Sequence, residues 1–218
     1  MKITQIREKE DAEALSVLDF DLLMEKIKTE TKTRPVTGLR QALHFVLPGE
    51  PCSFAGKLPK IMPAAVFGRV NGVRRMKVYN GIVELTVGPL AGKVEVELVK
   101  KKAADLPQTM FAYMGSSGNS VKIWTLFTRP DGTLPQTQEE AELFQAHAYR
   151  LAVKCYQPQI PFDIQLKEPL LEQYSRLSYD PAPFYRKNAV PFYLSQPFGM
   201  PKEMTYRERT VTEKSPLN

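Results

Sequence analysis

The stretch GIVELTVGPL, residues 81–90, decides which fold class the sequence favours. Aliphatic residues fill a short run that ends at Gly88 and Pro89. An apolar run of this length, closed by a Gly-Pro turn, is typical of a buried β-strand. We therefore expect residues 81–87 to form a central strand of a sheet.

Further strands are predicted around this one. TMFAYMG (109–115) and VKIWTLF (121–127) are apolar runs joined by SSGNS, which indicates a hairpin. GRVNGVRRMK (68–77) has an Asn-Gly pair at its centre, the strongest local signal for a tight hairpin turn. KIMPAAVF (60–67) suggests a strand with Pro63 at an edge or bulge, and FDIQL (162–166) a short strand.

Four helices are expected. An i, i+3, i+4 spacing predicts an amphipathic helix that starts near Asp11, and TGLRQAL (37–43) suggests a short second one. Residues 91–105 are ambiguous: VEVELV alternates like a strand, whereas ELVKKKAAD favours a helix, which we expect because a crossover is needed there. Thr137 and Glu140 form a capping-box pair that opens a helix to about Cys155. The spacing that predicts the first of these helices is that of Leu15, Leu18, Leu22 and Lys26.

The pattern divides the chain into three parts. Residues 1–34 are expected to be a helical leader ended by Pro35, residues 35–195 an α+β domain, and residues 196–218 a tail. After Pro169 the chain is rich in proline and tyrosine, so we expect irregular structure that packs on the body through aromatic side chains.

Composition narrows the class of protein. The chain has 218 residues, 43% of them hydrophobic, and a net charge of +6, which permits an anionic partner without establishing one. Cys52 and Cys155 fit no metal spacing and are expected to be reduced. The N-terminus lacks a signal peptide's apolar region, and no apolar run approaches membrane-spanning length. We therefore expect a soluble, cytoplasmic protein that does not associate with a membrane.

Several common enzyme classes lack their motifs. The sequence contains no G-x-S-x-G, no Walker lysine motif and no G-x-G-x-x-G. His44 and His147 are the only histidines, and His147 falls beside the apolar face of the capped helix, where a packed core residue is expected. The chain therefore gives no sequence support for a zinc site.

The turn GSSGNS (115–120) is the best candidate for a phosphate-binding element. The small residues Ser116, Ser117, Gly118 and Asn119 would let backbone N–H groups approach a phosphate, and Lys122 follows on the next strand. An ordinary hairpin turn with a surface lysine is the alternative.

Other cations would extend such a surface if the fold brought them together. Lys100, Lys101 and Lys102 form a basic run that is a candidate for salt-sensitive contact with nucleic acid, or is simply a solvated helix face. In SRLSYDP (175–181), Arg176 is a candidate phosphate ligand, or holds its loop through Asp180.

Several segments in order resemble the VirE N-terminal domain family of Bacteroides-type mobile elements. They include YNGIVELTVGPL, MGSSGNSVKIW, the capped helix and SRLSYDP, and the likeness covers roughly residues 35–195. That family looks like a divergent branch of the archaeo-eukaryotic primase superfamily. The resemblance implies an RRM-like palm: an α+β fold with a mixed or antiparallel sheet and helices packed on it.

The resemblance also implies where a primase site would lie. Primases carry an Asp-x-Asp pair on a central strand, whose two carboxylates point the same way and hold divalent metals. The matching positions here are Thr86 and Gly88, neither of which has a carboxylate. Lys122 stands where a histidine would follow the phosphate-binding turn, and the later carboxylate of the family would fall near Asp163, where the match is poor.

Three functions follow as expectations. The favoured one is a catalytically degenerate primase-like domain that binds nucleic acid, single-stranded DNA above all, or nucleotide. An active primase using Mg²⁺ or Mn²⁺ would need Glu84, about 6.6 Å along the strand from Thr86, with Asp163 or Asp180. The third is a structural or interaction domain that retains only the fold. A helicase or primase partner, or a further C-terminal domain, would fit the first.

Overall fold

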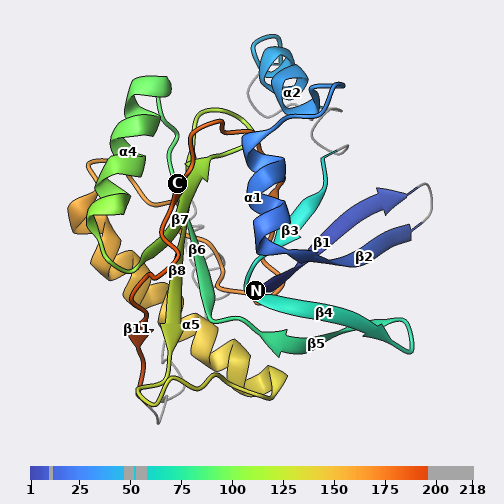
Figure 1. The fold of residues 1–218 in the computed structure, drawn as a ribbon, viewed down its shortest axis with the longest axis vertical. Coiled ribbons are helices and arrows are strands. Elements are labelled where there is room, and N and C mark those ends of the chain that lie inside the picture. The colour runs from blue at the N-terminus through green and yellow to red at the C-terminus, as the bar shows by residue number, and fades with distance from the viewer. Residues whose placement is uncertain (10–11, 47–51, 53–57, 196–218) are drawn as a thin grey trace, which may run out of the picture.

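The computed structural model describes residues 1–9, 12–46, 52 and 58–195. These residues form the predicted α+β fold, in which helices pack on largely antiparallel sheets (Figure 1). None of the described helices is both long enough and apolar enough to cross a lipid bilayer. The predicted tail, residues 196–218, lies outside the described residues.

The main sheet is built around β8 (Val121–Thr128). β6 (Ile82–Val87) and β7 (Thr109–Met114) both pair antiparallel with it, which confirms the predicted strands and the hairpin between β7 and β8. The central position predicted for β6 belongs to β8. On its other edge β6 forms a single β-bridge, between Val87 and Ile164. The strand predicted at 162–166 is reduced to this one bridge.

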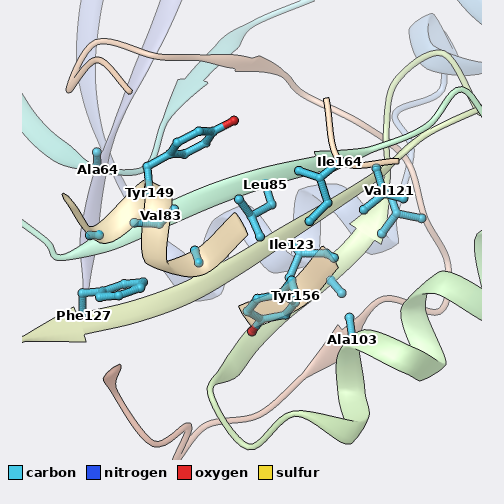
Figure 2. Close-up of a cluster of buried hydrophobic side chains, with 14 of the residues drawn as sticks. Ala64, Val83, Leu85, Ala103, Val121, Ile123, Phe127, Tyr149, Tyr156 and Ile164 are labelled. Atoms are coloured by element: carbon cyan, nitrogen blue, oxygen red, sulfur yellow. The ribbon is translucent and has the colours of Figure 1, made fainter. Parts of the chain in front are cut away.

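One face of this sheet packs on two helices, α4 (Lys93–Asp105) and α5 (Gln138–Tyr156). Figure 2 shows aliphatic residues of β6 and β8 meeting Tyr149 and Tyr156 of α5 and Ala103 of α4. Helix α4 settles the ambiguous segment in favour of the predicted helix. Helix α5 begins as predicted, because the Thr137 hydroxyl accepts a hydrogen bond from the Glu140 N–H at 3.3 Å.

The opposite face of the sheet carries aromatic side chains that helix α1 (Phe20–Lys28) covers. The ring of Phe20 lies 5.3 Å from that of Phe111 and 6.0 Å from that of Trp124, centroid to centroid. Both sheet residues are fully buried. This end of the face is therefore closed by side-chain packing.

The N-terminal segment corrects a prediction. A helix was expected from near Asp11, which lies outside the described residues, but β1 (Lys2–Lys9) and β2 (Ala12–Asp19) form a hairpin, and α1 begins only at Phe20. Leu18 pairs with Ile3 across the hairpin, and both side chains are buried under α1. Tertiary pairing outweighs the local helical spacing.

Sheet partners tie this hairpin to the body. β3 (Lys60–Met62) pairs with β1 on one side and with β9 (Ser175–Arg176) on the other. Pro63 ends β3, and β4 (Ala65–Val70) and β5 (Val73–Tyr79) then form the predicted hairpin. Its turn has positive φ at both Asn71 (49°) and Gly72 (78°), as an Asn-Gly turn requires.

The remaining elements are short. Helix α2 (Pro35–Leu43) confirms the second predicted helix and starts at Pro35, which has no N–H to satisfy in a first turn. A 3₁₀ turn, η1 (Gln157–Gln159), follows α5. Besides β9, the proline-rich segment adds β10 (Phe184–Tyr185) on β7 and β11 (Phe192–Tyr193), parallel to β8.

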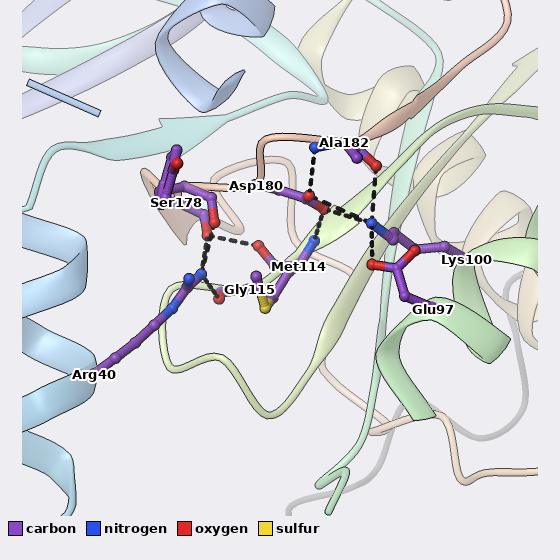
Figure 3. Close-up of polar contacts among 9 residues, drawn as sticks. Arg40, Glu97, Lys100, Met114, Gly115, Ser178, Asp180 and Ala182 are labelled. Atoms are coloured by element: carbon purple, nitrogen blue, oxygen red, sulfur yellow. Dashed lines mark hydrogen bonds and ion pairs between the residues drawn. The ribbon is translucent and has the colours of Figure 1, made fainter. Parts of the chain in front are cut away.

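Asp180 links three elements, two through its buried carboxylate and one through its backbone N–H (Figure 3). It accepts from the Lys100 ammonium of α4 at 3.0 Å and from the Met114 N–H of β7 at 2.8 Å. Its own N–H donates to the Ile27 carbonyl of α1 at 2.9 Å. The side chains of Asp180 and Lys100 are 2% and 5% exposed, so this ion pair is a buried structural contact.

Removing this carboxylate should destabilise the protein strongly. In Asp180→Ala the buried Lys100 ammonium would keep only the half-exposed Glu97, 2.8 Å away, as counter-charge, and the Met114 N–H would lose its acceptor, so we expect a loss of about 3 kcal/mol in the free energy of unfolding. Urea unfolding, followed by the fluorescence of the single tryptophan, measures the loss. The exposed Asp105→Ala serves as the control, expected within about 0.5 kcal/mol of wild type. Equal stability of the two variants would contradict the assignment.

Candidate functional site

A polar cluster lies on the sheet face that α1 partly covers, where β6 and β8 are paired. Their register sets Glu84 opposite Trp124 and Thr86 opposite Lys122. Because side chains alternate along a strand, these four point to the same face, away from α5. The cluster therefore contains Thr86, one of the two positions at which the resemblance to primases would put metal ligands.

Glu84 is held by three donors. Its carboxylate accepts from the Trp124 indole N–H at 2.8 Å and from the Ser175 hydroxyl of β9, and the Lys122 ammonium lies 3.5 Å away. The Glu84 side chain is only 5% exposed. The carboxylate considered for a metal is thus engaged by protein groups.

Two lysines converge on Thr86. The ammonium of Lys122 donates to the Thr86 hydroxyl at 2.9 Å, and that of Lys167 donates to the same oxygen at 3.1 Å. Thr86 is buried, whereas both lysine side chains keep partial exposure. The position that would bear a carboxylate in a primase is therefore surrounded by positive charge.

Sequence reasoning missed Lys167. The chain from Asp163 to Lys167 runs along the free edge of β6, where the Gln165 N–H donates to the Thr86 carbonyl at 2.8 Å. The Lys167 N–H donates to the Tyr149 hydroxyl of α5 at 2.9 Å, which fixes the backbone from which the side chain reaches Thr86. A single lysine after a short apolar run has no pattern that would reveal this.

Burial lowers the pKa of the Lys167 ammonium. The positive charge of Lys122 lowers this pKa further, and the negative charge of Glu84 acts in the opposite direction. The folded site therefore disfavours the charged form of Lys167, as expected of two ammonium groups that share one carboxylate.

Gly88 has no room for a side chain. Its φ is 139°, and a Cβ atom there would lie 2.8 Å from the Asn119 carbonyl oxygen. An aspartate at this position would require the turn between β7 and β8 to move. The missing second carboxylate thus follows from the local backbone as well as from the sequence.

The turn predicted to bind phosphate lies at the same end of the β6–β8 pair. The Asn119 carbonyl accepts from the Leu90 N–H at 2.8 Å, which joins the turn to the segment after β6. Gly118 has φ of 85°, a conformation that favours glycine. Ser116, Ser117, Gly118 and Asn119 are thereby brought to the end of the strand pair at which Lys122 lies, one residue after the start of β8.

Arg40 of α2 anchors this turn, a contact with no sequence signal. Its guanidinium donates to the carbonyls of Gly115 at 3.0 Å and Tyr179 at 2.7 Å (Figure 3). Burial lowers the pKa of Arg40, and the charge of Asp180 opposes this effect. The turn is thus held against the SRLSYDP segment by Arg40.

The other predicted cations are placed differently. Arg176 lies on β9 opposite Lys60 of β3 in the strand register, and its positive charge contributes to the lowered pKa of Glu8. The residue of β9 that contacts Glu84 is its neighbour Ser175. Lys100 does not belong to a surface, because its ammonium is buried against Asp180. Of the lysine run, Lys101 and Lys102 are exposed.

Two other features bear on ligand chemistry. Within residues 1–9, 12–46, 52 and 58–195, no group of three or more His, Cys, Asp or Glu side chains is placed to hold a metal ion. A cavity of about 310 Å³ lies between α5 and residues 168–172, but Glu142, Glu168 and Glu172 line it. Its carboxylates would repel a phosphate.

The fold and the site define an α+β domain with a cationic, carboxylate-poor cluster at the end of its central strand pair. The chain belongs to the family described as BT4734-like, N-terminal domain, whose model matches residues 53–185. No curated protein and no solved structure matches the chain. The match includes every residue of the cluster.

The lowered pKa of Lys167 predicts how stability depends on pH. The unfolded chain keeps this proton up to the ordinary pKa of 10.5, whereas the folded protein releases it at lower pH. Protonated Lys167 therefore destabilises the fold at neutral pH, and the penalty disappears as pH rises through the folded-state pKa towards 10.5.

We expect Lys167→Met to be more stable than wild type at pH 7, and the difference to shrink by pH 10. Urea midpoints at the two pH values measure it, with the exposed Lys154→Met as the charge-matched control. A variant that is less stable at pH 7 would show instead that the Lys167 contacts support the fold.

Proposed function

We propose that this protein is a catalytically degenerate primase-like domain that binds nucleic acid or nucleotide in the cytoplasm, in the replication or mobilisation of mobile elements. The observation that supports this best is the hydrogen bond from the Lys122 ammonium to Thr86, where a primase would place a metal-binding carboxylate. Positive charge at this point favours a phosphate as ligand.

The surroundings of Lys122 support the same ligand class. The small-residue turn of Ser116 to Asn119 lies at this end of the strand pair, where phosphate groups would meet both backbone and ammonium donors. Single-stranded DNA and nucleotides both present such groups. Base stacking on the sheet is not part of the proposal, because Phe111 and Trp124 are buried beneath α1.

Metal-dependent catalysis is poorly supported. Phosphoryl transfer of the primase type needs two metals about 3.5–4 Å apart, held by several carboxylates. Glu84 is engaged by Trp124 and Ser175, and Asp180 is engaged by Lys100. The active-primase alternative, with Mg²⁺ or Mn²⁺, would have to break these contacts.

A structural or interaction domain is the second candidate. The covering of the aromatic sheet face by α1 favours it, since this face would be open in an RRM-like nucleic-acid binder. In that case a helicase or primase partner, or a further domain, would use the outer surface.

Binding of a fluorescein-labelled single-stranded oligonucleotide, measured by anisotropy between 50 and 200 mM salt, tests the proposal. We expect affinity that falls with salt, and a slope of log K against log salt that is about 0.7 smaller in Lys122→Met, because one phosphate contact is lost. Lys154→Met, an exposed lysine of α5, is the control for net charge and should retain the wild-type slope.

Absence of binding to the oligonucleotide and to a deoxynucleoside triphosphate would reject the binding function and favour the interaction domain. Primer synthesis in the presence of Mg²⁺ or Mn²⁺, abolished by Glu84→Gln, would favour the active primase instead.

A further inference from the structure

Lys122 and Lys167 bring two ammonium groups to one buried hydroxyl. Their distances to the Thr86 oxygen, 2.9 and 3.1 Å, limit the separation of the two nitrogens to 6.0 Å. The two lysines come from different parts of the chain, β8 and the segment along the edge of β6. Like charges this close repel one another unless negative charge compensates them.

The negative charge within the cluster is incomplete. Glu84 is the carboxylate of the site, and it lies 3.5 Å from the Lys122 ammonium. Across the part of the chain that the structure describes, Lys167 makes no ion pair of its own. One positive charge is therefore left over at a half-buried position.

The Thr86 hydroxyl points to the same need. It accepts two hydrogen bonds, which occupy both lone pairs, so its own O–H remains to be donated. Thr86 is 4% exposed, and the two described groups that its hydroxyl contacts are ammonium donors, which cannot accept that hydrogen bond. A buried donor without an acceptor is costly, and an oxygen-rich anion would satisfy it.

We propose that Lys122, Lys167 and Thr86 form an oxyanion site for the phosphate group of a nucleotide or nucleic acid. The inference rests on the proposed function for the identity of this ligand. Three N–H or O–H donors of the site would meet the phosphate oxygens, and the ligand would supply the missing negative charge.

Glu84 has a positioning role in this arrangement. The Trp124 indole and the Ser175 hydroxyl hold its carboxylate, and the carboxylate in turn orients Lys122. Trp124 is the single tryptophan of the chain, and its indole donates directly to Glu84. Its fluorescence therefore reports on changes at the cluster.

A ligand site and a purely structural cluster differ in one measurable way. If Lys167 serves the fold, replacing it lowers the melting temperature. If it serves a ligand, Lys167→Met relieves the repulsion from Lys122, so the ligand-free variant melts at or above the wild-type temperature but no longer responds to phosphate.

The test compares wild type, Lys167→Met and the charge-matched control Lys154→Met in sodium phosphate and in sodium chloride of equal ionic strength. Phosphate at about 100 times its Kd should raise the melting temperature of wild type and control by roughly 5–10 °C. Titration followed by tryptophan fluorescence should show affinity for phosphate reduced roughly tenfold or more in Lys167→Met. Lys122→Met gives a second, independent variant with the same expected loss.

The outcomes separate the site from the proposed function. Equal phosphate responses in all the variants, or none in wild type, would overturn the site. Oligonucleotide binding that Lys167→Met leaves unchanged would overturn the site and leave the proposed function standing. A Lys167-dependent response to inorganic phosphate without oligonucleotide or nucleotide binding would support the site and overturn the proposed function.

Discussion

The antiparallel register between β6 and β8 sets Thr86 opposite Lys122 and Glu84 opposite Trp124. A shift of β6 by one residue would turn Glu84 and Thr86 towards α5, away from Lys122 and Trp124, and would bring Val83 and Leu85 to the polar side. The same pairing buries the aliphatic residues of both strands against α4 and α5. The hydrophobic core and the polar cluster thus depend on one set of backbone hydrogen bonds.

Around this strand pair, contacts distant in sequence complete the cluster. Ser175 comes from β9, and Lys167 from the segment that α5 holds through Tyr149. Asp180 and Arg40 hold the loop that follows β9 against β7 and against the small-residue turn. Because each of these groups is tied to a different element, the geometry at Thr86 belongs to the folded domain as a whole.

The positive charge around Thr86 indicates which ligand chemistry suits this member of the family. The chain is a BT4734-like N-terminal domain, and Lys122 of β8 and Lys167 beside β6 both donate to Thr86, one of the two positions at which the resemblance to primases would call for a carboxylate. A site that has two ammonium groups around Thr86 in place of a carboxylate pair prefers an anion to a cation as its ligand. The proposed loss of catalysis and the proposed gain of a direct phosphate contact follow from that one change.

The sequence by itself determined the elements whose signals are local. The Asn71-Gly72 turn, the Thr137 cap and the apolar strands β6, β7 and β8 were predicted correctly, because φ preferences, capping and side-chain alternation act over a few residues. Thr86 and Gly88 were singled out by the resemblance to primases, and Lys122 by its place after the small-residue turn.

Only the tertiary structure decided the rest. Leu15 and Leu18 have helical spacing but lie in a strand, because pairing with β1 and the burial of Leu18 under α1 stabilise the hairpin more than local propensity favours a helix. Lys100 looked like a surface cation and is buried because Asp180, 80 residues away, supplies its counter-charge. Lys167 donates to Thr86, 81 residues away, because Tyr149 of α5 holds its backbone beside β6. Long-range pairing of charges and edges leaves no periodic trace in a sequence, so it could be found only where the folded chain brings those groups together.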